Sequence, residues 1–148
     1  MTVLSRFDAW LGKTLFHPPI ILACQLTRQT QYAMNRALWF FAACHATYYA
    51  QGASWGIVAI LWSWVLVTFI SATVTPDMPT ASFGFWRFIW WLIFALGVAS
   101  ACTTGELSDG TVRALIILFA EYASTIKTIP PRRKREKRAS AKEAFNGQ

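Results

Sequence analysis

Between Ser54 and Thr75 the chain reads SWGIVAILWSWVLVTFISATVT, without a single charged side chain. A helix needs about 20 predominantly apolar residues to cross the hydrocarbon core of a bilayer, and this stretch is long enough. A turn sequence with Pro76, Asp77 and Pro79 follows it directly. The stretch therefore predicts a membrane-spanning helix, and it decides the fold class.

The composition of the whole chain agrees with this prediction. Of the 148 residues, 55% are hydrophobic, 16% are aromatic and only 14% are charged, whereas an average soluble domain has about 45–50% apolar and about 25% charged residues. Residues 37–86 contain Asp77 as their one charged side chain. Because residues 37–86 have too few charged side chains to form a water-soluble surface, we predict a tryptophan-rich, all-α integral membrane protein.

The remaining apolar segments complete a predicted transmembrane helical bundle over residues 19–129. A short Gln51-Gly52-Ala53 link makes a tight hairpin of the first two spans, and Ser108 is a suitable N-cap for the last one. We expect membrane spans at about residues 31–51, 54–75, 86–103 and 111–129.

Residues 1–18 have a different pattern. Apolar side chains recur at helical spacing over residues 3–16, with charged side chains elsewhere on the helix, which is typical of an amphipathic helix that lies in the plane of the interface. Proline disfavours helical geometry in the residue before it, so His17-Pro18-Pro19 should end this helix. We expect a second helix to start near Pro19 and to continue through the polar residues 25–35 into the membrane.

Basic residues predict the orientation, because Lys and Arg near the ends of spans favour the cytoplasmic side. One basic block precedes the first span and another follows the last. Both are cytoplasmic only if the chain crosses an even number of times, so we expect four spans in a bacterial inner membrane with both termini in the cytoplasm. The alternative is an outside N-terminus, three spans and a fourth helix in the membrane plane.

Residues 130–148 form a basic, exposed C-terminal tail, since they contain too little apolar material to bury a core. Its cationic side chains can dock on an acidic partner or on anionic lipid, at about 1 kcal/mol each near a membrane surface. Nucleic acid is an unlikely partner, because no aromatic residue that could stack on bases precedes Phe145 in the tail. The residues assigned to docking are Arg132, Arg133, Lys134, Arg135, Lys137 and Arg138.

His45 is the one histidine inside a predicted span, and small residues flank it. This setting makes it a candidate ligand for a haem or a pigment. The favoured interpretation is a neutral histidine that hydrogen-bonds to a neighbouring helix. The three cysteines have no CxxC spacing, so no metal site is predicted.

Glu121 is the acidic residue inside the fourth predicted span, and Arg113 precedes it by two turns. Ionisable groups at membrane depth are costly and therefore often functional. The two residues predict an ion path or an intramembrane pairing. The favoured interpretation pairs Glu121 with Lys127 or with a basic residue of another helix, or leaves it exposed if the helix lies flat.

Trp62 and Trp64 fall near the middle of the second span, away from the interfaces where tryptophan usually collects. We expect them to contact a partner or lipid. Small side chains recur every four residues in the first and third spans, which allows helices to pack closely. The residues assigned to helix packing are Ala42, Ala46, Ala50, Ala95, Ala99, Gly97 and Ala101.

No nucleophile, base and orienting group can be assembled from the sequence, so we do not expect an enzyme. The favoured function is a structural or assembly subunit of a secretion, conjugation, respiratory or light-harvesting complex, in contact with lipids and with other subunits or copies of itself. Bound lipid is the expected non-protein component. One alternative is a self-assembling pore of the phage holin type, which the chain resembles in size, in its several spans and in its basic C-terminus; another is a membrane tether for nucleic acid.

Overall fold

The computed structural model describes residues 3–50 and 52–127, and every regular element in these two ranges is helical. The predicted all-α class is therefore confirmed for this part of the chain. The elements are α1 (Val3–Leu11), a π-helical segment η1 (Gly12–Phe16), α2 (His17–Thr27), α3 (Gln31–Tyr48), α4 (Trp55–Val74), α5 (Gly84–Thr104) and α6 (Asp109–Thr125).

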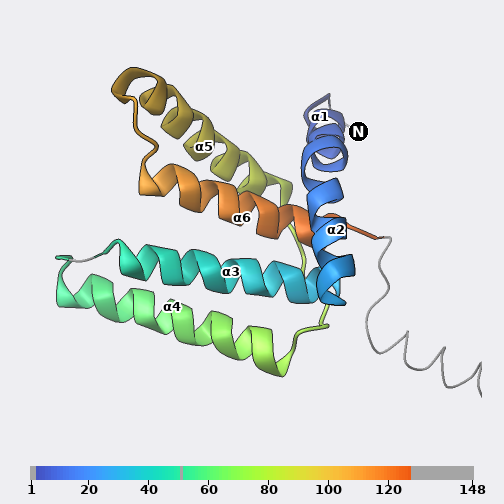
Figure 1. Cartoon of the computed structure of the whole chain (residues 1–148), viewed down its shortest axis with the longest axis horizontal. Helices are drawn as coiled ribbons and strands as arrows, with labels where there is room; N and C mark the ends of the chain where they lie inside the picture. The colour runs from blue at the N-terminus through green and yellow to red at the C-terminus, as the bar shows by residue number, and fades with distance from the viewer. Residues whose placement is uncertain (1–2, 51, 128–148) are drawn as a thin grey trace, which may run out of the picture.

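The four long helices lie side by side in a row whose spatial order is α5, α6, α3, α4 (Figure 1). Helices α3 and α6 are central, whereas α4 packs on α3 alone and α5 on α6 alone among the four. Successive helices run in opposite directions, so the start of α3 and the end of α6 lie at the same end of the row. The rod formed by α1, η1 and α2 lies across that end (Figure 1).

Small side chains form the contact between the two central helices. Such residues let helix backbones approach closely, and a hydrogen bond from Asn35 Nδ2 of α3 to the carbonyl oxygen of Ala120 in α6 (2.6 Å) shows how close the helices are. The fully buried residues of this contact are Ala42, Ala43 and Ala46 in α3 and Ala114, Ile117 and Ala120 in α6. Ala42 and Ala46 were predicted as packing residues, and Ala50, next in that series, is half-buried.

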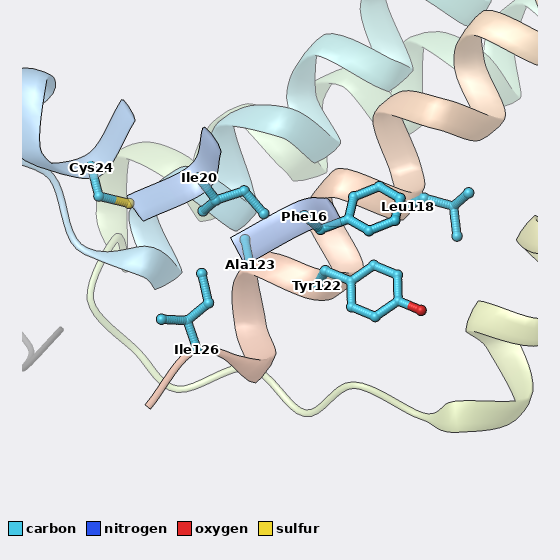
Figure 2. Packing of buried hydrophobic residues seen from close by; sticks show 7 residues of the cluster. All are labelled: Phe16, Ile20, Cys24, Leu118, Tyr122, Ala123 and Ile126. Atoms are coloured by element: carbon cyan, nitrogen blue, oxygen red, sulfur yellow. The ribbon is translucent and has the colours of Figure 1, made fainter. Parts of the chain in front are cut away.

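A second apolar cluster attaches the N-terminal rod to the row (Figure 2). The Phe16 ring stacks on the Tyr122 ring of α6, with their centroids 4.5 Å apart. The cluster consists of Phe16, Ile20 and Cys24 from the rod with Leu118, Tyr122, Ala123 and Ile126 from α6 and the residue after it.

An element boundary does fall at the predicted His17-Pro18-Pro19, since η1 ends at Phe16 and α2 begins at His17, although no non-helical residue separates them. Helix α2 begins at His17, directly after η1, and carries its prolines in the first turn. Proline is tolerated there because the first amide groups of a helix have no intrahelical partner. Gly12 in η1 faces Tyr122, and a Cβ atom at this position would lie 2.8 Å from Tyr122 Cδ1. The rod therefore continues past the prolines and rests on α6.

The predicted continuous helix through residues 25–35 is wrong. Helix α2 ends at Thr27, because Arg28 adopts a left-handed backbone conformation with φ of 55°. Thr30 then caps α3: its Oγ1 accepts a hydrogen bond from the amide of Ala33 (3.1 Å) and donates one to Asp77 Oδ1 (2.8 Å). Thr30 therefore caps α3 and also binds the loop that follows α4.

Of the described helices, α4 and α5 are long and apolar enough to cross a membrane, with mean hydropathies of 2.2 and 1.6. Neither contains a buried residue. Their bounds agree with two of the four predicted spans to within two residues. Helices α3 and α6 cover the segments predicted as the first and fourth spans; with 18 and 17 residues, they are not among the described helices that are long and apolar enough to cross.

Candidate functional site

A network of charged and polar side chains occupies the end of the row beneath the rod. Arg87 in the first turn of α5 pairs with Asp8 of α1 at 2.6 Å (Nη2 to Oδ2), and the two side chains are 13% and 28% exposed. Arg87 also donates through Nη1 to Ser82 Oγ, which in turn donates to Glu121 Oε2 (2.7 Å). Arg87 therefore links carboxylates from α1 and α6.

Tyr122 completes this network. Its hydroxyl donates to Asp8 Oδ1 (2.6 Å) and accepts a hydrogen bond from the indole Nε1 of Trp91 (3.0 Å). The Arg87 guanidinium carbon lies 5.6 Å from the centre of the Tyr122 ring, which is within the range of a cation–π contact. Elements α1, α5 and α6 meet at this one side chain.

Arg36 of α3 forms a second cluster with α4 and the loop after it. Its Nη1 donates to Ser71 Oγ (2.5 Å) and Thr75 Oγ1 (2.6 Å), and its Nη2 donates to the carbonyl oxygen of Met78 (3.0 Å). The residue is only 8% exposed. Burial of a guanidinium is costly unless its hydrogen bonds are satisfied, and these acceptors supply most of them.

A cavity of about 250 Å³ lies between the two clusters, bounded by α3, α4, α6 and the loop that precedes α5. Two polar atoms of its lining residues are buried without a hydrogen-bond partner in the described part of the chain: Arg36 Nε and Thr80 Oγ1. The lining residues are Asn35, Arg36, Trp39, Val67, Thr68, Ser71, Thr80, Ala81 and Glu121. The cavity thus places a cationic and an acidic side chain around one space.

A wider groove of about 800 Å³ runs between the rod and the end of α6. His17, which lines it, hydrogen-bonds through Nε2 to Thr125 Oγ1 (3.0 Å). Burial lowers the pKa of His17 below its ordinary value of 6.5, because the charged imidazolium is less well solvated there.

The structure places Glu121 and Arg113 apart. Glu121 accepts its hydrogen bond from Ser82, whereas Arg113 lies in the first turns of α6, near the other end of the row, where its Nε is buried without a partner in the described ranges. The two residues form no ion pair with each other, since the ion pair found within the described residues joins Arg87 and Asp8. Glu121 connects instead through Ser82 to Arg87, a basic residue of another helix.

His45 lies near the end of α3 with its ring centre 4.7 Å from that of Tyr49. Its Nδ1 is buried and has no hydrogen-bond partner among the described residues. Within the same ranges, no group of three or more His, Cys, Asp or Glu side chains gathers as a metal site would require.

The two midspan tryptophans have different surroundings. Trp62 is 61% exposed, whereas Trp64 packs edge-on against Trp39 of α3, with ring centroids 6.1 Å apart.

Of the predicted packing residues in α5, Gly97 touches α6, because a Cβ atom there would lie 2.0 Å from Thr111 Oγ1. Ala95 and Ala99 are exposed, and Ala101 is half-buried. The predicted docking residues 132–138 lie outside the described residues.

Sequence reasoning missed Asp8, Arg36, Arg87 and Tyr122 as site residues. The available signal was position: Arg36 and Arg87 are single charges at the ends of long apolar segments, and such charges need partners when helices pack.

Comparison of the chain with protein-family models, curated proteins and solved structures finds no match.

Proposed function

We propose that this chain is a small multi-spanning membrane protein that acts as a non-catalytic subunit of a larger membrane assembly. The observation that carries the proposal is the apolar surface of the two outer helices. Soluble monomers rarely expose contiguous apolar patches of more than a few hundred Å², yet α4 and α5 contain no buried residue. Their large exposed side chains include Trp55 (89%), Ile60 (70%), Phe85 (70%) and Leu96 (62%).

The arrangement of the row supports four crossings. Helix α6 lies between α3 and α5 and runs along them, so it is not set apart as an in-plane helix would be (Figure 1). The rod lies across the ends of α3 and α6, as expected of an interfacial element. The N-terminal basic residues lie at that end, and the C-terminal block follows the end of α6 in the sequence. The positive-inside tendency therefore assigns that end to the cytoplasmic side of a bacterial inner membrane.

Two features support a structural role in an assembly. The ionisable groups of the Asp8–Arg87–Ser82–Glu121 network bind one another and join α1, α5 and α6. Tryptophan on an outer face is a typical anchor residue at protein interfaces, and Trp62 of α4 is available for such a contact.

Purification of the tagged chain in a mild detergent, followed by mass spectrometry, tests the proposal. We expect stoichiometric partner proteins to co-purify with the wild type and to be lost from a Trp62→Ala variant that keeps its unfolding temperature. Trp64→Ala is the matched control, because Trp64 packs inside the chain on Trp39 and its loss should lower stability. A monomer without partners, or rapid collapse of the membrane potential on expression, would contradict the subunit role, and the second result would indicate a pore.

A further inference from the structure

The cavity between α3, α4 and α6 has walls of opposite charge. Arg36 lies on one side, more than nine-tenths buried, and its Nε is a donor without a partner in the described residues. The Thr80 hydroxyl, also unpartnered and buried, adds a second donor. Glu121 lines the same space, and one carboxylate oxygen is engaged by Ser82.

We propose that this cavity binds a phosphate–ammonium zwitterion of the phosphoethanolamine class. The phosphate accepts hydrogen bonds from Arg36 Nε and Thr80 Oγ1, and the ammonium group pairs with Glu121. Trp39 also lines the cavity, and an aromatic face is favourable for an ammonium group. A simple anion would meet the Glu121 carboxylate and a simple cation would meet the Arg36 guanidinium, so a ligand with both charges fits better than either.

The size of the cavity agrees with this ligand. At about 30 Å³ for each water-sized group, 250 Å³ holds about eight such groups. A phosphoethanolamine group has a similar number of non-hydrogen atoms. The volume is therefore sufficient for the whole headgroup.

The position of the cavity favours a phospholipid as the source, an argument that rests on the proposed membrane location. Arg36, Ser71 and Glu121 lie near helix ends, at the level where headgroups meet the helices. Val67 lines the cavity and is 64% exposed, and Leu66 next to it is 59% exposed. The apolar surface of α4 thus begins at the cavity and can receive acyl chains.

The test measures the thermal unfolding midpoint of the purified full chain in mild detergent. The added probes are phosphatidylethanolamine, phosphatidylglycerol, phosphatidylcholine and, in parallel, soluble phosphoethanolamine. A ligand present at about 100 times its dissociation constant should raise the midpoint by roughly 5 °C or more. We expect phosphatidylethanolamine to do this and the other two lipids to have at most half the effect.

Two variants connect the shift to the cavity. Glu121→Gln keeps a hydrogen-bond acceptor for Ser82 but removes the negative charge, and Thr80→Val removes the free hydroxyl at similar volume. Both should lose at least half of the shift. Glu106→Gln, the same change at an exposed residue near the other end of the row, should retain all of it.

Three results would overturn the proposal: an unchanged shift in Glu121→Gln, an equal or larger shift with phosphatidylglycerol, or no shift with any probe. A shift with soluble phosphoethanolamine as large as that with the lipid would support the site and assign it a soluble ligand. Flotation of the chain with phosphatidylethanolamine vesicles separates this inference from the proposed function. A chain that does not float but is stabilised by phosphoethanolamine keeps the site and loses the membrane role; a chain that floats without headgroup preference loses the site alone.

Discussion

Tyr122 joins three helices through a single hydroxyl group. It donates to Asp8 of α1, accepts from Trp91 of α5 and belongs to α6 itself. Removal of one partner from a buried hydrogen bond leaves the other unsatisfied, which costs about 1–3 kcal/mol. The stability of this end of the row should therefore depend on one oxygen atom.

Tyr122→Phe should lower the free energy of unfolding by about 1–3 kcal/mol, because the Trp91 indole loses its acceptor and Asp8 Oδ1 loses one of its two donors. Thermal unfolding in detergent measures the change. Tyr48→Phe is the control, since Tyr48 is 66% exposed, and it should have no effect. Equal midpoints for the wild type and Tyr122→Phe would show that the network does not stabilise the fold.

His17 should make stability depend on pH. Its pKa is lowered in the folded chain relative to 6.5, so the unfolded chain binds the proton more readily. The contribution of His17 to stability is fully present above pH 6.5 and is lost as the pH falls below that value.

The unfolding midpoint of the wild type should fall between pH 7.5 and pH about 5.5, and His17→Gln should remove much of that slope while Gln still bonds Thr125. A His17→Gln variant that kept the wild-type slope would show that the assignment to His17 is wrong.

Charges at the ends of apolar segments are visible in the sequence, but their partners are not. Arg87 and Asp8 are 79 residues apart, and nothing in either local pattern indicates that α1 and the start of α5 meet. Glu121 could be recognised as a costly residue, yet its partner Ser82 lies in a loop without regular periodicity. A basic partner on another helix was expected for Glu121, but the choice of Arg87, reached through Ser82, depends on tertiary packing.

Helices α4 and α5 could be predicted almost to the residue, because long apolar runs without charges leave few alternatives. The unbroken course of the N-terminal rod through its prolines could not be predicted in this way. The sequence pattern contains two prolines, but their effect depends on position within a helix turn, and here they occupy the first turn of α2. The hydrogen bond from Thr30, which caps α3, to Asp77 likewise joins distant segments.

The contact between α5 and α6 depends on the absence of a side chain at Gly97. Gly97→Ala would place its Cβ 2.0 Å from Thr111 Oγ1, and such overpacking costs about 1–3 kcal/mol. The unfolding midpoint should fall accordingly, and Thr111→Ala should restore part of the loss.

Gly56→Ala in α4 is the matched control. A Cβ atom there meets nothing within 4 Å, and alanine is favoured over glycine inside a helix by about 0.5–1 kcal/mol. The control should be neutral or slightly stabilising. A Gly97→Ala variant as stable as the control would mean that α5 does not pack on α6 in this register.

At the scale of the whole molecule, the antiparallel row brings the N-terminal rod and the end of α6 to one end. The basic residues 132–138 follow α6 in the sequence, outside the described residues. Replacement of Arg132, Arg133, Lys134, Arg135, Lys137 and Arg138 by glutamine should weaken binding to anionic vesicles, because each removes about 1 kcal/mol of surface attraction. The difference in vesicle binding between the wild type and the variant should shrink in high salt. Vesicle sedimentation measures this binding. Equal binding by both proteins at low salt would exclude a docking role.

The central claim is that the row crosses a membrane with its two ends on opposite sides. Labelling of single cysteines by a membrane-impermeant maleimide in intact bacterial cells tests it most directly, in a chain whose native cysteines are replaced. Ser54→Cys and Leu107→Cys mark one end of the row, and Leu26→Cys and Met78→Cys mark the other; all four sites are exposed. We predict that the first pair is labelled in intact cells and the second pair only after permeabilisation. Equal labelling of all four in intact cells, or a chain recovered in the soluble fraction, would contradict the claim.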